Sequence, residues 1–266
     1  MSDNLSQSAF YQQDCFGFRE VGRSTKSEIA YQQQLDDYAV SSVGTPSEKF
    51  ENFPKYITRQ TTARYLALYE IFKIVLPVQG DIIEGGVNWG GGLMWFAQMS
   101  AALEPFNLQR RIIGFDTFSG FPDLHSNDTK HAEIGKEHRE GGYQANSFED
   151  LRQCLEIYDQ NRAIGHVPKV RLIRGDAGET MPQYLIDNPH TVVSLLHLDF
   201  DIYSPTKAAI DTFLNRMPKG AVIVFDELNC PKWPGETQAV VESLLIQRLR
   251  IQRFIFEPYL SYAVIE

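Results

Sequence analysis

The sequence predicts an α/β fold with a doubly wound, seven-stranded and mostly parallel sheet. Seven apolar, strand-like segments punctuate the chain, and from residue 81 onward helical patterns alternate with them. The first four segments end on acidic residues, which puts carboxylates at the carboxyl ends of buried strands. In open α/β sheets that edge binds ligands.

The strand-like segments are residues 81–86, 111–116, 170–176, 197–201, 220–227, 252–257 and 261–265. The chain leaves no room for a helix between the last two segments. They are therefore expected to be antiparallel neighbours.

Helices are predicted where apolar residues recur at helical spacing. The first, over residues 57–75, is an N-terminal helical extension of the sheet domain, with Thr58 as its expected N-cap. Ser204 and Pro205 are expected to start a later helix as N-cap and first helical residue. The other predicted helices cover residues 89–103, 148–158, 179–187, 206–216 and 235–250.

Two regions differ in composition from the predicted sheet domain, which spans residues 53–266. Residues 1–52 are rich in Ser, Gln and Asp, and we interpret them as a mobile N-terminal arm that takes its order from a partner, which suggests a homo-oligomer. Residues 118–147 are polar and fit no element. A loop this long in a compact domain is usually a functional lid or disordered, so we predict a lid-like insert.

Charge and apolar patterning restrict the class of partner. The net charge of −9 argues against nucleic acid, because phosphate binding needs a basic footprint. No apolar stretch reaches the roughly 18 residues of a membrane span, and the polar N-terminus lacks a signal-type core. Three distant cysteines, Cys15, Cys154 and Cys230, fit a reducing compartment and predict a cytoplasmic protein without a disulfide framework.

A glycine-rich turn follows the first strand, over residues 84–92. Glycines here let a ligand approach the backbone, and the helix that follows supplies free N–H groups. The turn is a poor dinucleotide fingerprint, because Glu84 would lie beside a pyrophosphate. A cationic ligand suits this carboxylate better; the alternative is a turn that only packs.

Acids end the next two strands. Asp116 stands where a carboxylate commonly bridges the two ribose hydroxyls of an adenosine ligand, although it also fits a helix N-cap or a turn. Asp176, in the triplet Gly175-Asp176-Ala177, suits an exocyclic amine such as that of adenine. Gly-Asp is equally common in turns, and both interpretations stay open.

Four carboxylates converge at the fourth and fifth strand ends. Asp199 and Asp201 are two residues apart on a strand and so are expected to face the same side, and Asp226 and Glu227 end the next strand. Such a group is strongly repulsive without a cation, and oxygen-only ligands favour Mg²⁺. The alternative is a set of ion pairs with lysines and a helix cap.

These motifs together resemble those of class I S-adenosylmethionine-dependent methyltransferases, which have a Rossmann-like sheet. Specifically, they are similar to the macrocin O-methyltransferase family, which contains metal-dependent sugar O-methyltransferases of antibiotic pathways. A likeness over residues 53–60 and 69–72 points to the branch that methylates nucleotide-linked 6-deoxyhexoses at the 3-hydroxyl. The segments that carry the family resemblance are IEGGVNWGG (83–91), GFDTFSGFP (114–122), HLDFDIY (197–203) and VFDE (224–227).

The resemblance implies a function: methyl transfer from S-adenosylmethionine to a deoxyhexose hydroxyl, with help from Mg²⁺. The partner would then be a sugar or sugar nucleotide. The implied cofactor-binding residues are Glu84, Gly85, Gly86 and Asn88 for the methionine end, Asp116 and Thr117 for the ribose, and Asp176 and Ala177 for the adenine.

The resemblance also implies roles for the acids. Asp199, Asp226 and Glu227 would hold the metal, although the family often has Asp where this chain has Glu227. Asp199 is the first choice for the catalytic base and Asp201 the second. Substrate contacts are expected from Arg59, Arg64 and His138.

Two other function classes stay open. One is a different enzyme on the same scaffold, either a hydroxylase or a nicotinamide dehydrogenase, the latter disfavoured by the malformed fingerprint and by Glu84. The other is a non-catalytic nucleotide-binding protein with a decayed site. Acids at all five strand ends argue against decay.

Overall fold

The structure is a computed structural model that describes residues 25–266, and these form two compact units that divide between Ala63 and Arg64. Residues 1–24, which include Cys15 and part of the predicted arm, lie outside the described residues. Among the described helices, none has the length and apolarity needed to cross a membrane.

The N-terminal unit contains helices where composition predicted an arm. Helix α1 (Lys26–Ser41) begins in a capping box, in which Thr25 and Glu28 satisfy each other's backbone N–H groups. Helix α2 (Pro46–Glu51) starts with a similar box at Thr45, and the 3-10 turn η2 (Phe53–Lys55) follows. The predicted mobility of the arm and its dependence on a partner stay predictions.

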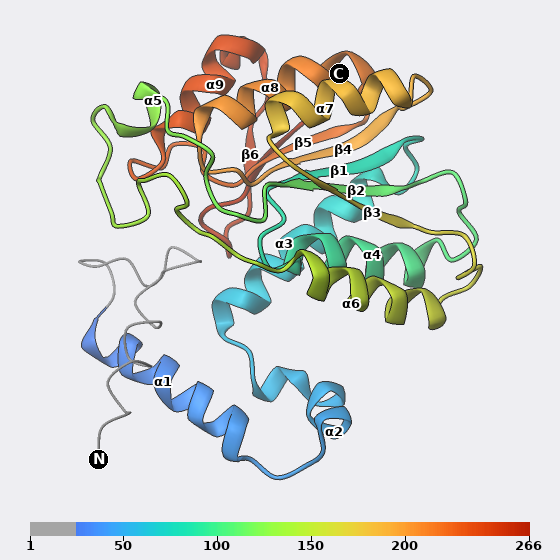
Figure 1. Cartoon of the computed structure of the whole chain (residues 1–266), viewed down its shortest axis with the longest axis vertical. Coiled ribbons are helices and arrows are strands. Elements are labelled where there is room, and N and C mark those ends of the chain that lie inside the picture. The colour runs from blue at the N-terminus through green and yellow to red at the C-terminus, as the bar shows by residue number, and fades with distance from the viewer. Residues whose placement is uncertain (1–24) are drawn as a thin grey trace. The chain divides into compact units, whose positions relative to one another are not determined.

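The second unit is built on a seven-stranded sheet, which confirms the predicted fold class (Figure 1). The order is β3-β2-β1-β4-β5-β7-β6, and β7 is antiparallel to both of its neighbours. The last strand pair is antiparallel as predicted, but β6 has only two residues. The strands are β1 (Asp81–Gly85), β2 (Ile112–Asp116), β3 (Val170–Arg174), β4 (Val193–Leu198), β5 (Val222–Phe225), β6 (Gln252–Arg253) and β7 (Ser261–Val264).

Helices cover both faces of the sheet (Figure 1). Helices α3, α4 and α6 pack on one face and α7, α8 and α9 on the other, and successive residues of a strand alternate between the two cores. In β1, for example, Ile82 enters the first core and Ile83 the second. The helices are α3 (Arg59–Val75), α4 (Gly91–Leu103), α5 (Ser126–Thr129), α6 (Phe148–Gln160), α7 (Ala177–Asp187), α8 (Tyr203–Phe213) and α9 (Pro234–Leu244), with the 3-10 turns η3 (Leu214–Arg216) and η4 (Ile246–Arg248).

The starts of α3 and α8 test two predicted caps. Thr58 accepts a hydrogen bond from the N–H of Thr61 at 3.0 Å, as predicted. The Ser204 cap is wrong, because α8 begins at Tyr203, whose N–H donates to the Asp128 carboxylate at 2.7 Å. Asp128 comes from the insert, so sequence near α8 gave no sign of it.

The predicted lid-like insert is packed rather than featureless. It contains α5, and its Phe121 joins a small apolar cluster with Ile202 and Trp233. Asp128 is fully buried, and a Cβ added to Gly235 would lie 1.8 Å from its Oδ1. The insert is thereby fitted against the starts of α8 and α9; its action as a lid stays a prediction.

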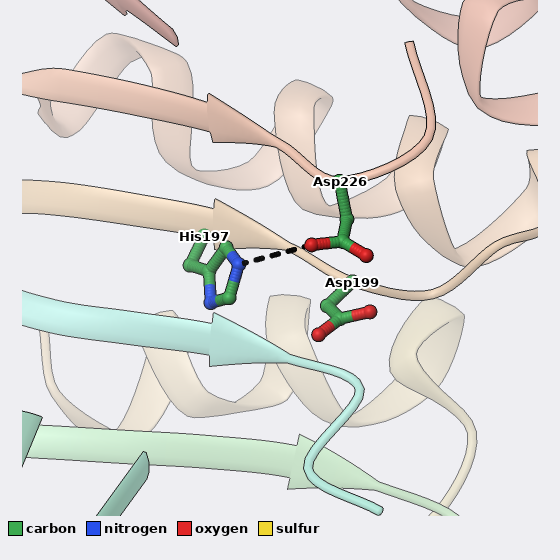
Figure 2. A group of neighbouring side chains, drawn as sticks. All are labelled: His197, Asp199 and Asp226. Carbon is green, nitrogen blue, oxygen red and sulfur yellow. Dashed lines mark ion pairs between the residues drawn. The ribbon is translucent and has the colours of Figure 1, made fainter. Parts of the chain in front are cut away.

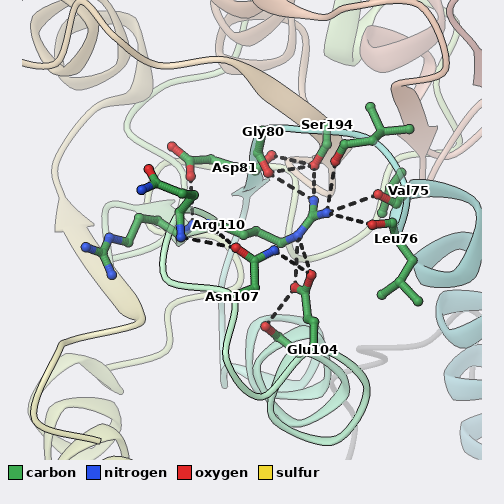
Figure 3. A network of polar contacts seen from close by, with 12 residues as sticks. Val75, Leu76, Gly80, Asp81, Glu104, Asn107, Arg110 and Ser194 are labelled. Atoms are coloured by element: carbon green, nitrogen blue, oxygen red, sulfur yellow. Dashed lines mark hydrogen bonds and ion pairs between the residues drawn. The ribbon is translucent and has the colours of Figure 1, made fainter. Parts of the chain in front are cut away.

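A buried arginine joins the end of α3 to the start of β1 (Figure 3). Arg110 is 3% exposed; it donates to the carbonyls of Val75, Val78 and Gly80 and pairs with Glu104 at 2.9 Å. The carbonyls at a helix end lack partners within the helix, and Arg110 adds a charged donor to several carbonyls of this segment.

Candidate active site

Four polar side chains meet on the α3 side of the sheet, at the carboxyl ends of β1, β4 and β5. Strand alternation puts Glu84 on the same face as Ile82, and His197 and Asp226 on the faces of Leu195 and Val224. Asp199 follows His197 by two residues. The sheet therefore gathers these groups on the face that residues 64–75 of α3 cover.

His197 lies between two of the acids. Its Nδ1 lies 3.2 Å from Oε1 of Glu84. Its Nε2 lies 4.0 Å from Oδ1 of Asp226 (Figure 2). His197, Asp199 and Asp226 each offer one ligand atom within 4.8 Å of the others. Nε2 has no hydrogen-bond partner among the described residues. The sequence analysis gave His197 no role, although it lies in the quoted motif.

Arg64 of α3 bridges the two aspartates. Its Nη1 donates to Oδ1 of Asp226 at 2.6 Å and its Nη2 to Oδ2 of Asp199 at 2.7 Å. Although burial opposes the charge, Asp226 and Asp199 raise the pKa of Arg64 above its ordinary value. The structure thus brings one of the predicted substrate residues into direct contact with two predicted metal ligands.

Burial and mutual repulsion disfavour ionisation of several acids in this cluster. Burial, together with Asp226, raises the pKa of Asp199 to about 7. Burial and neighbouring acids also raise the pKa of Asp201 and of Glu227 well above their usual values. Asp201 follows the end of β4 at Leu198 and has φ +63°, so the alternation expected for Asp199 and Asp201 does not apply.

Glu236 is a further buried acid, in the first turn of α9. Its Oε1 accepts the N–H of Glu227 at 3.0 Å, while its Oε2 has no hydrogen-bond partner among the described residues. Burial, then Asp226, raises the pKa of Glu236 well above its usual value. From sequence, residues 233–236 are expected to wall an acceptor pocket or, equally, to form a plain loop; the role as a pocket wall stays a prediction.

These acids fit a hard divalent cation. Asp199 and Asp226 offer carboxylate oxygens close together, and such oxygens are the ligands that Mg²⁺ prefers. Crowding that raises the pKa of Asp199 would be relieved by two positive charges. Glu227 lies outside the group formed by His197, Asp199 and Asp226, and its role as a metal ligand stays a prediction.

The glycine-rich turn lies directly against the acid cluster. Gly86 has φ +87°, and a Cβ there would lie 1.8 Å from the carbonyl oxygen of Asp199, so only glycine fits. In the same turn, Glu84 Oε2 and Asn88 Oδ1 are buried and lack hydrogen-bond partners within the described part of the chain. Two such acceptors fit the ammonium group of a methionine moiety.

Asp116 shapes this turn. Its Oδ2 accepts the N–H groups of Val87 and Asn88 at 2.8 Å each, and its Oδ1 accepts the N–H of Phe118 at 2.6 Å. A carboxylate offers about four acceptor positions, so the predicted ribose contact would use the remaining capacity. Thr117 donates to the carbonyl of Gly120 at 2.6 Å. The roles of Asp116 and Thr117 toward a ribose stay predictions.

The predicted adenine residues lie at the start of α7. Asp176 is its N-cap and accepts the N–H of Gly178 at 2.7 Å, and Ala177 is the first helical residue. The turn that the sequence analysis weighed as an alternative is therefore present. A contact to adenine stays a prediction.

Arg59 and His138 are the other two predicted substrate residues, and their role toward a substrate stays a prediction. Arg59, the exposed first residue of α3, belongs to the N-terminal unit. His138 stacks on Trp233 with ring centroids 4.0 Å apart, and its Nε2 lies 2.9 Å from the carbonyl oxygen of Lys232. His138 therefore helps to hold the insert against the loop before α9.

Comparison with known proteins decides the family. The profile of the Macrocin-O-methyltransferase (TylF) family matches residues 62–243, more than half of the chain. The chain belongs to this family. The matched segment contains Arg64 and the four polar residues at the strand ends, Glu84, His197, Asp199 and Asp226.

Solved structures support the macrocin O-methyltransferase assignment. The crystal structure of CalS11, a calicheamicin methyltransferase, has a TM-score of 0.87 and 32% identity, over 95% of this chain and 98% of that one. An apo structure of CalS11, described as a TDP-rhamnose 3'-O-methyltransferase, has a TM-score of 0.78 at the same identity, over 95% and 99% of the two chains. The O-methyltransferase NovP shares the fold, with a TM-score of 0.61 and 20% identity over 76% and 79%.

A curated relative from Streptomyces olivaceus is similar over a shorter stretch. It is an 8-demethyl-8-(2,3-dimethoxy-α-L-rhamnosyl)-tetracenomycin-C 4'-O-methyltransferase, 28% identical over 155 residues. The alignment covers 56% of this chain and 53% of the relative, so the chain spans about half the length of that protein.

Proposed function

We propose that the protein transfers a methyl group from S-adenosylmethionine to a hydroxyl of a deoxyhexose, with a divalent cation at Asp199 and Asp226. Family membership supports O-methyl transfer. The names of the relatives support a sugar acceptor, since one acts on TDP-rhamnose and another on a rhamnosyl compound. Of these, CalS11 is matched over nearly its whole length, which favours a nucleotide-linked sugar.

The observation that carries the proposal is the contact between Gly86 and the Asp199 carbonyl oxygen. It puts the turn expected to bind the methionine end against the acids expected to bind the acceptor hydroxyl. A methyl donor and an alcohol held at these two places would be neighbours, and positioning of this kind supplies roughly 7–11 kcal/mol of a barrier.

The acids would assist removal of the proton from the acceptor hydroxyl. A bound divalent cation would lower the pKa of the acceptor hydroxyl. Asp199 is the first candidate for the group that takes the proton. Asp201 is the second candidate, and both choices stay open. Glu84 and Asn88 would hold the ammonium group of the methyl donor with their unpaired oxygens.

Isotopically labelled S-adenosylmethionine tests the proposal. The protein is incubated with Mg²⁺ and a nucleotide-linked deoxyhexose, with and without chelator. We expect label in the sugar that disappears when chelator is added and returns with excess Mg²⁺. Cofactor binding without transfer to any sugar would contradict the proposed activity, and transfer that resists chelator would contradict the cation.

A further inference from the structure

Arg64 occupies the position between the acids where a cation would bind. Its guanidinium is 16% exposed and holds one oxygen of Asp226 at 2.6 Å and one of Asp199 at 2.7 Å. The two carboxylates come from neighbouring strands, and the arginine comes from a helix more than 130 residues earlier in the chain. This bridge is built from three elements of the fold rather than from one mobile loop.

The guanidinium and a divalent ion would compete for the same oxygens. Mg²⁺ takes oxygen ligands at about 2.0–2.1 Å in a compact octahedron. A divalent ion on these oxygens would repel the positive guanidinium and compete with it for the same lone pairs. Binding of the ion through these two oxygens therefore favours the departure of Arg64 from them.

We propose that Arg64 is a built-in counter-ion, which keeps Asp199 and Asp226 together without metal and is displaced when a divalent cation binds. The inference rests on the proposed function and goes beyond it, because it gives Arg64 a role in cation binding instead of the substrate contact expected from sequence. It predicts that Arg64 sets the cation affinity of the site, weakening it.

A second acid makes the displacement feasible. Glu257 is 3% exposed and close enough for its charge to raise the pKa of Arg64, after the larger effects of burial, Asp226 and Asp199. Burial raises the pKa of Glu257, and the nearby Arg64 partly opposes this effect. A displaced guanidinium would therefore still have the carboxyl group of Glu257 nearby.

The test is a Mn²⁺ titration of chelator-treated protein, with free Mn²⁺ measured by electron paramagnetic resonance. We expect Arg64→Ala to bind Mn²⁺ more tightly than wild type, by a factor on the order of 5 to 150. Arg64→Lys should give an intermediate affinity, because an ammonium keeps the charge but lacks the planar fork. Arg152→Ala, which removes an exposed arginine paired with Glu149 on α6, should bind as wild type does.

Chemical rescue separates this role from a structural one. Millimolar guanidinium ion should weaken Mn²⁺ binding to Arg64→Ala and raise its melting temperature in chelator. It should have neither effect on wild type, and methylammonium should do neither in the variant. A general loss of structure would not respond to so specific a cation.

Two results would overturn the inference. If wild type binds Mn²⁺ and Arg64→Ala or Arg64→Lys binds it equally or more weakly, the inference fails while the proposed function stands. If no form of the protein binds Mn²⁺ although labelled methyl is transferred, both the inference and the proposed cation fail. Tighter binding by the alanine variant that guanidinium reverses supports the inference.

Discussion

The Nδ1 of His197 lies 3.2 Å from Oε1 of Glu84, and both side chains are buried. The two residues are register partners on adjacent strands β1 and β4, so the sheet itself sets this contact. His197 also faces Asp226 with its other nitrogen. The expected methyl-donor site and the expected cation site are therefore joined through one imidazole.

Replacing His197 should weaken both sites. In His197→Asn, Glu84 loses a buried partner, and we expect the free energy of unfolding to fall by about 1–3 kcal/mol. Affinity for S-adenosylhomocysteine should fall as well, as measured by calorimetric titration. A double-mutant cycle with Glu84→Gln checks the contact: additive effects on stability would show that the two residues do not interact.

Loss of the Asp199 carboxylate should stop turnover and spare the cofactor. We expect Asp199→Asn to abolish methyl transfer and to leave cofactor affinity within about tenfold of wild type, because the proposed role of the side chain is toward acceptor and cation rather than methyl donor. The control is Asp211→Asn on α8, where the acid is exposed and paired with Lys207. Near-normal turnover of Asp199→Asn would disprove the assignment.

Asp128 should hold the insert in place. It accepts the N–H groups of Tyr203 and His125 at 2.7 and 2.8 Å. Asp128→Ala removes the partner of the first N–H of α8, and we expect a loss of about 0.5–2 kcal/mol in stability. Limited proteolysis within residues 118–147 should become faster. Asp123→Ala, at an exposed position of the same insert, should leave cleavage unchanged; equal cleavage of both variants would refute the role.

Arg110 should be irreplaceable by lysine. Arg110→Met leaves Glu104 and several buried carbonyls without their donor, and we expect unfolding to become easier by about 3–5 kcal/mol in urea titrations. Arg110→Lys should recover little, since an ammonium cannot reproduce the planar fork of donors. An Arg152→Met control should stay within about 0.5 kcal/mol of wild type. A stable Arg110→Lys protein would show that charge alone suffices.

Lys169 should make the free energy of unfolding vary with pH in the alkaline range. Burial, with help from neighbouring arginines, lowers the pKa of Lys169 to about 8. The unfolded chain keeps an ordinary lysine pKa near 10.4, so it binds more protons between pH 8 and 10. Below pH 8, Lys169 therefore lowers the free energy of unfolding by its full contribution. This loss is recovered as pH rises from 8 to 10.

The Lys169→Met variant isolates this effect. Relative to the variant, the free energy of unfolding of wild type should rise by about 2 kcal/mol from pH 7.5 to pH 10. Chemical denaturation across this range measures the difference, and other titrating groups cancel in the comparison. Parallel curves for the two proteins would show that Lys169 has an ordinary pKa.

The fold could be predicted from sequence because the spacing of apolar residues and the residues that end each apolar segment are local signals. The acids that end β1, β2, β4 and β5 follow apolar runs, and parallel strands bring such ends to one edge. The antiparallel last pair followed from the short link between residues 253 and 261. The α1 and α2 helices were missed because their capping boxes were outweighed by a polar composition.

The details of the site depend on contacts between distant residues. The pairing of Arg64 with two acids more than 130 positions away leaves no mark in a local pattern, and neither does the cap that Asp128 gives to α8. The prediction for Asp201 was wrong for a different reason. It applied the alternation of strand side chains past the end of β4, to a residue with φ +63°. The burial of Glu236 was not predicted, because a glutamate is common in sequence and only its buried position in the fold sets this one apart.

The close fit of Gly235 against Asp128 limits how these enzymes can be recombined. A chimera that takes only residues 118–147 from a relative would bring a foreign side chain against a glycine selected for another surface. Segments 126–129, 202–203 and 233–235 would need to be transplanted as one unit.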